Sequence, residues 1–182
     1  YGLGYEDLAA LNPRLIYCSI SGYGRTGSRA EEAGYDFAIQ AESGLMAITG
    51  EPEGAPMKHG VAITDIVTGM NATQAILAAL IARGRTGEGQ HLDMALFDSA
   101  IALLANIGSG HLATGAAPGR FGNAHATVVP YQIFETADGV IALAVGNDQQ
   151  FKTLCERVLG RADLAGDDRY VRNRDRVLNR DT

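Results

Sequence analysis

Cysteine and long apolar runs are both scarce in this chain of 182 residues. Its two cysteines, Cys18 and Cys155, lie far apart, which excludes a disulfide framework and a Cys-x-x-Cys site and fits a reducing compartment. The longest apolar run, residues 75–82, is well short of the roughly 20 residues that cross a bilayer. We therefore expect no membrane span and a cytoplasmic protein, or a mitochondrial matrix protein if the source is a eukaryote.

Positive charge is also in deficit, with 15 Lys and Arg against 21 Asp and Glu and a formal net charge of -6. Such a chain has no overall attraction for a polyanion, so no nucleic-acid partner is expected. The composition, 46% hydrophobic and 20% charged, is that of an ordinary globular protein and excludes disordered and collagen-like classes.

Several motifs of known enzyme classes are missing. The histidines share no i, i+4 spacing and have no partner cysteines, so no metal site is predicted; they are His59, His91, His111 and His125. Residues 19–22 lack the first glycine of a Gly-x-Ser-x-Gly elbow, which disfavours a serine hydrolase. The glycines of residues 22–27 imitate a dinucleotide fingerprint, but residues 28–34 show no helical period, so a phosphate-binding role is disfavoured.

What is present is an alternation of helix and strand patterns typical of an α/β fold. The patterns predict helices over residues 5–11, 36–48 and 71–83, the last buried on all sides and preceded by the apolar residues 63–70, with strands over 14–20 and 90–96. Asp98 or Ser99 is expected to cap a helix that ends near residue 112. Residues 49–60, rich in proline and glycine, form a candidate lid.

The composition changes around residues 114–123, where we place a boundary between an α/β domain, residues 1–118, and a smaller α+β domain, residues 119–182. A hairpin over residues 128–145 is predicted, with Asp138-Gly139 supplying positive φ angles at its turn. Asn147 or Asp148 should cap a helix that stops at Gly160. The Arg-rich residues 169–182 alternate with aspartates, which favours a solvated helix face.

Both ends of the chain lack start and stop signals, so we expect a fragment of a longer protein.

Asp65 is the only ionised group in residues 61–82, where an apolar segment leads into the predicted buried helix. Periodicity alone favours an N-cap for that helix, worth about 1 kcal/mol. The alternative is a nucleophile, because a carboxylate held in a dry pocket can attack an activated carbonyl and form an anhydride. Gly69 either allows close approach of a ligand or packs against another helix. Both pairs of alternatives stay open at this point.

Four segments, taken in order, resemble the class III coenzyme A-transferase (CaiB/BaiF) family; they are residues 34–36 (Gly-Tyr-Asp), 64–70, 86–90 and 92–98. Residues 122–125, 129–132 and 146–151 are most similar to the branch that includes succinate-hydroxymethylglutarate CoA-transferase. The resemblance extends over nearly the whole chain and corresponds to the middle of a family member. It implies a partial Rossmann-like large domain followed by the start of a small domain.

The resemblance implies transfer of coenzyme A from an acyl-CoA, such as succinyl-CoA, to a free carboxylic acid, with no metal and no permanently bound cofactor. Asp65 matches the covalent nucleophile, which forms an aspartyl anhydride and then an aspartyl-CoA thioester. This chemistry requires a water-shielded carboxylate and backbone donors for the oxyanions. From their position near Asp65 we take Gly60, Val61 and Gly69 as the candidate donors.

Tyr35 separates two activities within the resemblance. The related α-methylacyl-CoA racemases carry histidine at this position, whereas tyrosine, with a pKa near 10, is a poor base at neutral pH. Transfer is therefore favoured over racemisation, with Tyr35 orienting or contacting CoA; the plainer interpretation is a half-buried aromatic. Leu96 matches a position that lines the CoA pocket in a relative, and His125 could meet a dicarboxylate, although an exposed loop histidine is favoured.

Family members are interlocked homodimers, so the resemblance also implies a second copy of the chain as partner. An isolated fragment should leave large apolar surfaces uncovered and is expected to be inactive. A non-enzymatic binding or assembly module, with Asp65 a mere cap, is the remaining alternative.

Overall fold

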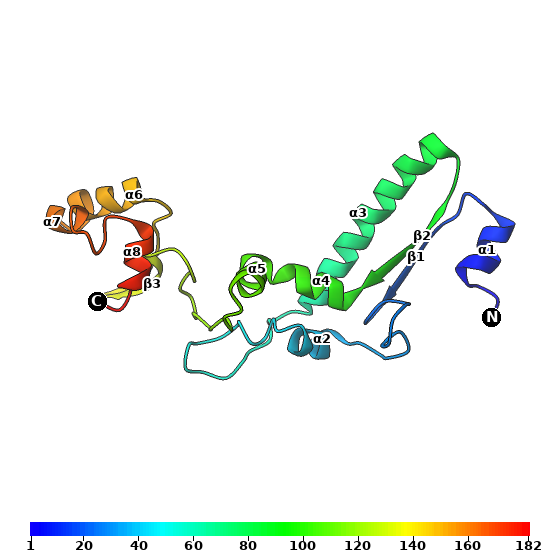
Figure 1. Cartoon of the computed structure of the whole chain (residues 1–182), viewed down its shortest axis with the longest axis horizontal. Coiled ribbons are helices and arrows are strands. Elements are labelled where there is room, and N and C mark those ends of the chain that lie inside the picture. The colour runs from blue at the N-terminus through cyan, green and yellow to red at the C-terminus, as the bar shows by residue number, and fades with distance from the viewer. The chain divides into compact units, whose positions relative to one another are not determined.

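The computed structural model describes all residues from Tyr1 to Thr182 and divides into two compact units, Tyr1–Arg120 and Phe121–Thr182. Figure 1 shows both units with most of their helices and strands labelled. Each unit has its own sheet. The division falls two residues after the limit of 118 that the sequence suggests.

The first unit is a βαβ arrangement. Strand β1 (Ile16–Ser21) follows helix α1 (Tyr5–Leu11) and pairs in parallel with strand β2 (Gln90–Ala95), in a register that runs from Ile16↔Gln90 to Ser21↔Ala95. Helix α3 (Ile63–Thr86) forms the crossover between the two strands. The α/β prediction is confirmed for this unit, and both predicted strands form within two residues of their expected limits.

The turn between α3 and β2 requires glycine twice. Gly87 ends α3 in the left-handed region, at φ 81°, where residues with a Cβ are disfavoured. A Cβ atom on Gly89 would lie 1.9 Å from the carbonyl oxygen of Leu15, so only glycine lets the chain enter β2 beside β1. The Gly-Glu-Gly part of the turn is thus explained by backbone packing alone.

Helix α3 differs from its prediction in burial. Only Thr64, Thr68, Ala72 and Ala79 are buried along its 24 residues, while large apolar side chains face outward: Ile66, Met70, Leu77, Leu80 and Ile81. The prediction of a helix buried on all sides is therefore wrong for this chain. Its four buried residues recur at helical spacing and form one stripe along the helix. A stripe of this width is covered by one neighbouring layer of structure.

By length and composition, α3 is also apolar enough to cross a membrane. This property is not visible as one apolar run, because small polar residues interrupt the sequence of the helix. Core helices of soluble proteins are often equally long and apolar. In this chain, α3 packs against both strands and two other helices of its unit. We interpret α3 as a helix of the α/β unit.

Two further helices complete the core of the first unit. Helix α2 (Asp36–Glu42) and helix α4 (Leu96–Leu103) contribute Ile39, Leu96 and Ala100, with Tyr23 and Phe97 packed against them. The predicted helix 36–48 was too long, because Gly44, at φ 86°, interrupts it.

The prediction of a cap at Asp98 or Ser99 was also wrong. Helix α4 begins directly at the end of β2, with Ala95 as its N-cap. It is followed by helix α5 (Ala105–Thr114) after a bend of 80°. The bend coincides with Ala105, the only non-glycine residue with positive φ.

The candidate lid, residues 49–60, has no helix or strand. The Arg120 guanidinium donates to the carbonyl oxygens of Glu51, at 3.1 Å, and of Gly54. Further, longer contacts reach Ala47 and Pro52. The several N–H donors of the planar Arg120 guanidinium thereby hold the first half of this loop in place.

The second unit pairs a hairpin with short helices. Strands β3 (Tyr131–Thr136) and β4 (Gly139–Ala144) are antiparallel, as predicted. The two turn residues are Ala137 and Asp138, and neither they nor Gly139 has positive φ, so the predicted turn conformation is wrong. The side chain of Asp138 instead accepts a hydrogen bond from the Thr136 hydroxyl.

The predicted helix 149–159 forms in two parts, helix α6 (Asp148–Thr153) and a π-helical segment, η1 (Leu154–Val158). Its predicted cap is confirmed, because the Asn147 side chain accepts the Gln150 N–H at 2.9 Å. Helices α7 (Ala162–Ala165) and α8 (Asn173–Leu178) follow. The buried core of this unit consists of Val145, Phe151 and Cys155.

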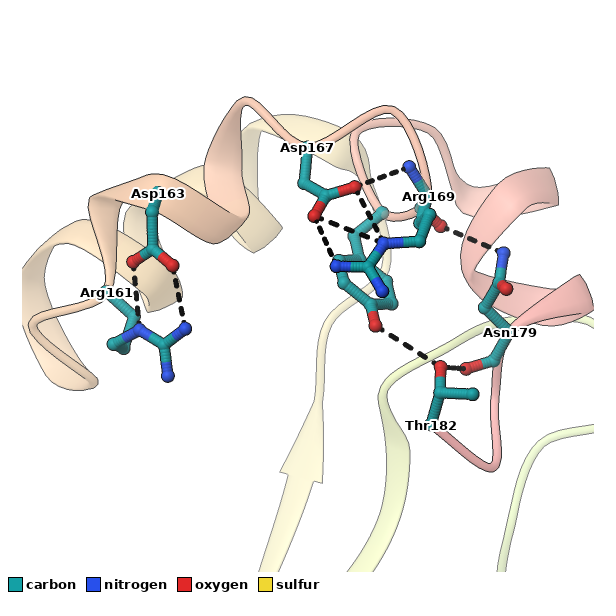
Figure 2. Close-up of polar contacts among 7 residues, drawn as sticks. Arg161, Asp163, Asp167, Arg169, Asn179 and Thr182 are labelled. Atoms are coloured by element: carbon teal, nitrogen blue, oxygen red, sulfur yellow. Dashed lines mark hydrogen bonds and ion pairs between the residues drawn. The ribbon is translucent and has the colours of Figure 1, made fainter.

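The Arg-rich segment is only partly a solvated face. Figure 2 shows two ion pairs, Arg161 with Asp163 at the start of α7 and Arg169 with Asp167 in the loop after it, each at 2.7 Å. Hydrogen bonds from Arg169 lower the pKa of Asp167 to about 2. Arg176, in contrast, is only 2% exposed, so the prediction of a solvated face is wrong at this residue.

Candidate active site

Asp65 is the third residue of α3, and its side chain is exposed. The N-cap of the helix is Ala62, so the interpretation of Asp65 as the cap is wrong. The expectation of a water-shielded carboxylate is also not met in this chain. The position still places a negative charge in the first turn of α3, where it interacts favourably with the partial positive charge of the helix N-terminus.

A second carboxylate, which the sequence did not single out, fills the capping role. Asp36 at the start of α2 accepts hydrogen bonds from both the backbone N–H and the hydroxyl of Thr64, at 2.9 and 2.8 Å. Thr64 is fully buried and directly precedes Asp65. Asp36 therefore satisfies an N–H group that the helix itself leaves without a partner.

The other oxygen of Asp36 accepts a hydrogen bond from the Gln40 amide, at 2.7 Å. Gln40 is fully buried, and its own carbonyl accepts the backbone N–H of His59, at 2.9 Å. The chain of contacts thus joins α2, the first turn of α3 and the end of the candidate lid.

The environment of Asp36 favours its ionised form. Partial burial raises the pKa of this carboxyl, but hydrogen bonds from Thr64 and Gln40, together with the Lys58 charge, outweigh burial and lower the pKa below its ordinary value. A carboxylate that accepts several hydrogen bonds is stabilised in this way.

This shift predicts an acid-dependent stability. Because the pKa is lower in the folded chain, the contribution of Asp36 is fully present above the unfolded value near 3.9 and is lost as the pH falls through the folded value. Below about pH 4, the unfolding free energy of the natural protein should fall more steeply than that of Asp36→Asn. Urea unfolding between about pH 2.5 and 6 measures both slopes. Equal slopes would contradict the prediction.

The candidate oxyanion donors lie around Asp65. Gly69 is one turn further along α3, and a Cβ atom there would meet nothing within 4 Å, so its role is not helix packing in this chain. Gly60 and Val61 are exposed and immediately precede the helix. Their backbone N–H groups are bonded to no other group of the chain. Two free amides and an open helix face at Gly69 therefore lie within one or two turns of Asp65 along the chain, but the Gly69 N–H is inside α3 and belongs to the helix, so Gly69 is not a free donor.

Tyr35 and Leu96 lie in different environments. Tyr35 is 77% exposed and is the N-cap residue of α2, beside Asp36, so it is not the half-buried aromatic of the plainer interpretation. Leu96 is 7% exposed and packs against Ile39 and Ala100. Its predicted contact with CoA stays a prediction.

His125 belongs to the second unit and is half-buried, not a freely exposed loop residue. Its Nδ1 atom accepts the Thr127 N–H at 3.1 Å, and its ring lies 5.3 Å from that of Tyr131. The other nitrogen, Nε2, makes no hydrogen bond within the chain, so contact with a dicarboxylate stays a prediction.

The glycine-rich residues 22–27 have a structural explanation. Gly22 contacts the backbone of Gly34 so closely that a Cβ on either residue would lie 2.5 Å from the other's Cα. The Asp93 carboxylate accepts the Arg25 N–H at 2.8 Å. No three His, Cys, Asp or Glu side chains are grouped as metal ligands.

Known proteins resemble this chain along its whole length. Residues 1–182 match the profile of CoA-transferase family III. The chain is 54% identical to the succinate–glutarate CoA-transferase of Agrobacterium fabrum, over 99% of the chain and 45% of that protein. It is 46% identical to the human succinyl-CoA:glutarate CoA-transferase, over 98% of the chain and 41% of that protein.

Solved structures agree. A CaiB/BaiF family protein from Brucella suis matches with a TM-score of 0.78 and 53% identity, over 99% of this chain and 47% of that one. Rv3272 from Mycobacterium tuberculosis matches with a TM-score of 0.83 and 33% identity, over 98% of this chain and 46% of that one. The chain thus spans less than half the length of these relatives, as the expectation of a fragment implies. It belongs to CoA-transferase family III.

Proposed function

We propose that the intact protein transfers coenzyme A from an acyl-CoA donor such as succinyl-CoA to a dicarboxylic acid. The observation that carries this proposal is the family match over all 182 residues. The relatives' names supply the substrates, since the similar proteins are named for glutarate, oxalate and mesaconate. The open helix face at Gly69 and the two free amides of Gly60 and Val61 are consistent with the chemistry.

In the proposed reaction, the Asp65 carboxylate attacks the thioester carbonyl, the C–S bond breaks, and an aspartyl–acyl anhydride and the CoA thiolate form. The thiolate attacks the aspartyl carbonyl, which releases the donor acid and leaves an aspartyl-CoA thioester. The acceptor carboxylate attacks this thioester and expels the thiolate again. Attack of the thiolate on the acceptor carbonyl then yields the new acyl-CoA and regenerates Asp65. No net proton is consumed.

The exposed Asp65 requires cover, because an anhydride open to water would hydrolyse. We propose that this cover, and that of the apolar side of α3, comes from a second copy of the chain in an interlocked homodimer. The outward-facing Ile66, Met70, Leu77 and Ile81 support the proposal, since a continuous apolar patch on a helix marks a contact surface.

Racemisation of an α-methylacyl-CoA is the alternative within the resemblance. It needs a base at position 35, and a phenol is a poor general base at neutral pH, whereas the imidazole of the racemases is a good one. Tyr35 therefore favours transfer.

An acceptor screen on the intact protein tests the proposal. With succinyl-CoA as donor, glutarate, oxalate and mesaconate should each be compared with pentanoate, which matches glutarate in length but lacks the second carboxylate. We expect kcat/KM for at least one diacid to exceed that for pentanoate by about tenfold or more. Absence of any new CoA ester would contradict the proposal. Deuterium exchange at the α-carbon without an acceptor would favour the racemase.

A further inference from the structure

Gln40 forms a hydrogen bond with each end of its side-chain amide, to Asp36 and to the backbone of His59. The side chain is fully buried in α2, and both its nitrogen and its oxygen have a hydrogen-bond partner within the chain. Its Nε2 donates to Asp36, a carboxylate that can only accept, and its Oε1 accepts the N–H of His59, which can only donate. These partners determine the orientation of the amide uniquely.

A buried amide is costly unless such partners are in place, and an apolar side chain of similar size, such as leucine or methionine, would fill the same volume without that cost. Fold stability alone therefore does not explain a glutamine here. What an apolar residue could not do is join Asp36 to the backbone at His59. That connection reaches the segment with the free amides, Gly60 and Val61, on one side and the first turn of α3 on the other.

We propose that Gln40 is a positioning residue for CoA transfer, which with Asp36 fixes the backbone of His59–Val61 relative to the first turn of α3. This inference rests on the proposed function of Asp65. Asp36 locates Thr64, the residue before Asp65, through two hydrogen bonds. Gln40 locates His59, the residue before Gly60. The amides and the carboxylate thus share one rigid connection, and misplacement by about 1 Å in an active site costs on the order of 100-fold in rate.

The hydrogen bond between Asp36 and Gln40 is tested by exchanging the carboxylate and the amide between the two positions. In Asp36→Asn, the new amide can accept from Thr64 only by turning its NH₂ group toward the NH₂ group of Gln40. In Gln40→Glu, two carboxylates face each other at a former hydrogen bond of 2.7 Å. In the double variant, the new amide at position 36 donates to the new carboxylate at position 40, which still accepts the His59 N–H. All four hydrogen bonds are then restored, with the charge moved by one turn of α2.

We expect each single variant of the intact protein to lose about tenfold or more in kcat while KM changes by less than about twofold. The double variant should recover kcat to within about threefold of the natural protein. The yield of hydroxylamine-trapped Asp65 after addition of succinyl-CoA should follow the same order. A purely structural role would instead lower kcat only through loss of folded protein, so a single variant that is still folded at the assay temperature would keep both kcat and the yield of trapped Asp65.

Thr64→Val supplies a measurement that does not depend on the folding of the other variants. It keeps the shape of the side chain and the backbone N–H but removes one of the two donors to Asp36, so a smaller kcat loss is expected. Full activity in Gln40→Glu, or a double variant no better than the single ones, would overturn the proposal for Gln40. Absence of CoA transfer in the natural protein would instead refute the proposed function.

Discussion

Asp65→Asn should abolish CoA transfer by the intact protein, with a fall in kcat of at least about 1,000-fold. The amide is a far weaker nucleophile than the carboxylate, and no other acidic side chain lies in residues 61–82 to replace it. Steady-state assay of succinyl-CoA consumption measures the loss. Hydroxylamine trapping followed by mass spectrometry should modify Asp65 in the natural protein only.

The effect on stability should be small. Asp65 is exposed and is not the N-cap, so the substitution removes only a favourable charge in the first turn of α3, worth about 1 kcal/mol or less. Asp98 provides a matched control, because it is also exposed and is the third residue of its helix, α4. Asp98→Asn should retain activity. Comparable turnover in Asp65→Asn and Asp98→Asn would refute the covalent mechanism.

Strong local signals explain why much of the fold could be predicted. The parallel strands β1 and β2, the hairpin and the Asn147 cap each depend on side-chain alternation or turn chemistry within about ten residues. The start of α4 could not be predicted in this way. Capping residues at 98 and 99 suggested a later start, but β2 continues into the helix without a side-chain cap.

The site was predictable where it depends on one residue type in one motif, and not where it depends on distant contacts. Asp65 stood out because it is a lone carboxylate in an apolar segment. The capping of α3 by Asp36 joins residues 28 positions apart, and no periodicity indicates such a pair. The only sequence signal was that Asp36 belongs to the Gly-Tyr-Asp segment of the family resemblance. Gln40 gave no signal, since a glutamine in a helix is ordinarily exposed.

The burial of α3 was wrongly predicted for a different reason. A helix with apolar residues on all sides is expected to be covered on all sides, but the pattern does not identify what covers it. In this chain one stripe contacts the strands and neighbouring helices, and Met70, Leu77 and Ile81 remain exposed. Periodicity therefore reports how apolar the helix is, whereas the 182 residues bury only one stripe of it.

Arg176→Met is the substitution expected to destabilise the second unit most. The guanidinium of Arg176 donates to the carbonyl oxygens of Val129 and Tyr170, both at 2.7 Å, and to Asp148 at 2.8 Å. It also lies 4.3 Å from the centre of the Phe151 ring. Methionine fills part of the volume but removes the side-chain donor of both carbonyl oxygens, whereas Asp148 keeps the Asn173 N–H, at 2.9 Å.

We expect Arg176→Met to lower the free energy of local unfolding by about 3 kcal/mol, since the carbonyl oxygens of Val129 and Tyr170 lose their donor, whereas Asp148, 55% exposed, can turn to water. Hydrogen exchange of the β3–β4 and α6 amides measures this, and their protection should fall roughly 100-fold. Arg176→Lys should be intermediate, because one ammonium group cannot reach three divergent acceptors as the planar fork does. Arg174, whose side chain is 80% exposed beside Asp175, is the control, and Arg174→Met should leave protection unchanged. Equal protection in the Arg176 and Arg174 variants would show that the buried guanidinium does not hold the hairpin, the Tyr170 loop and α6 together.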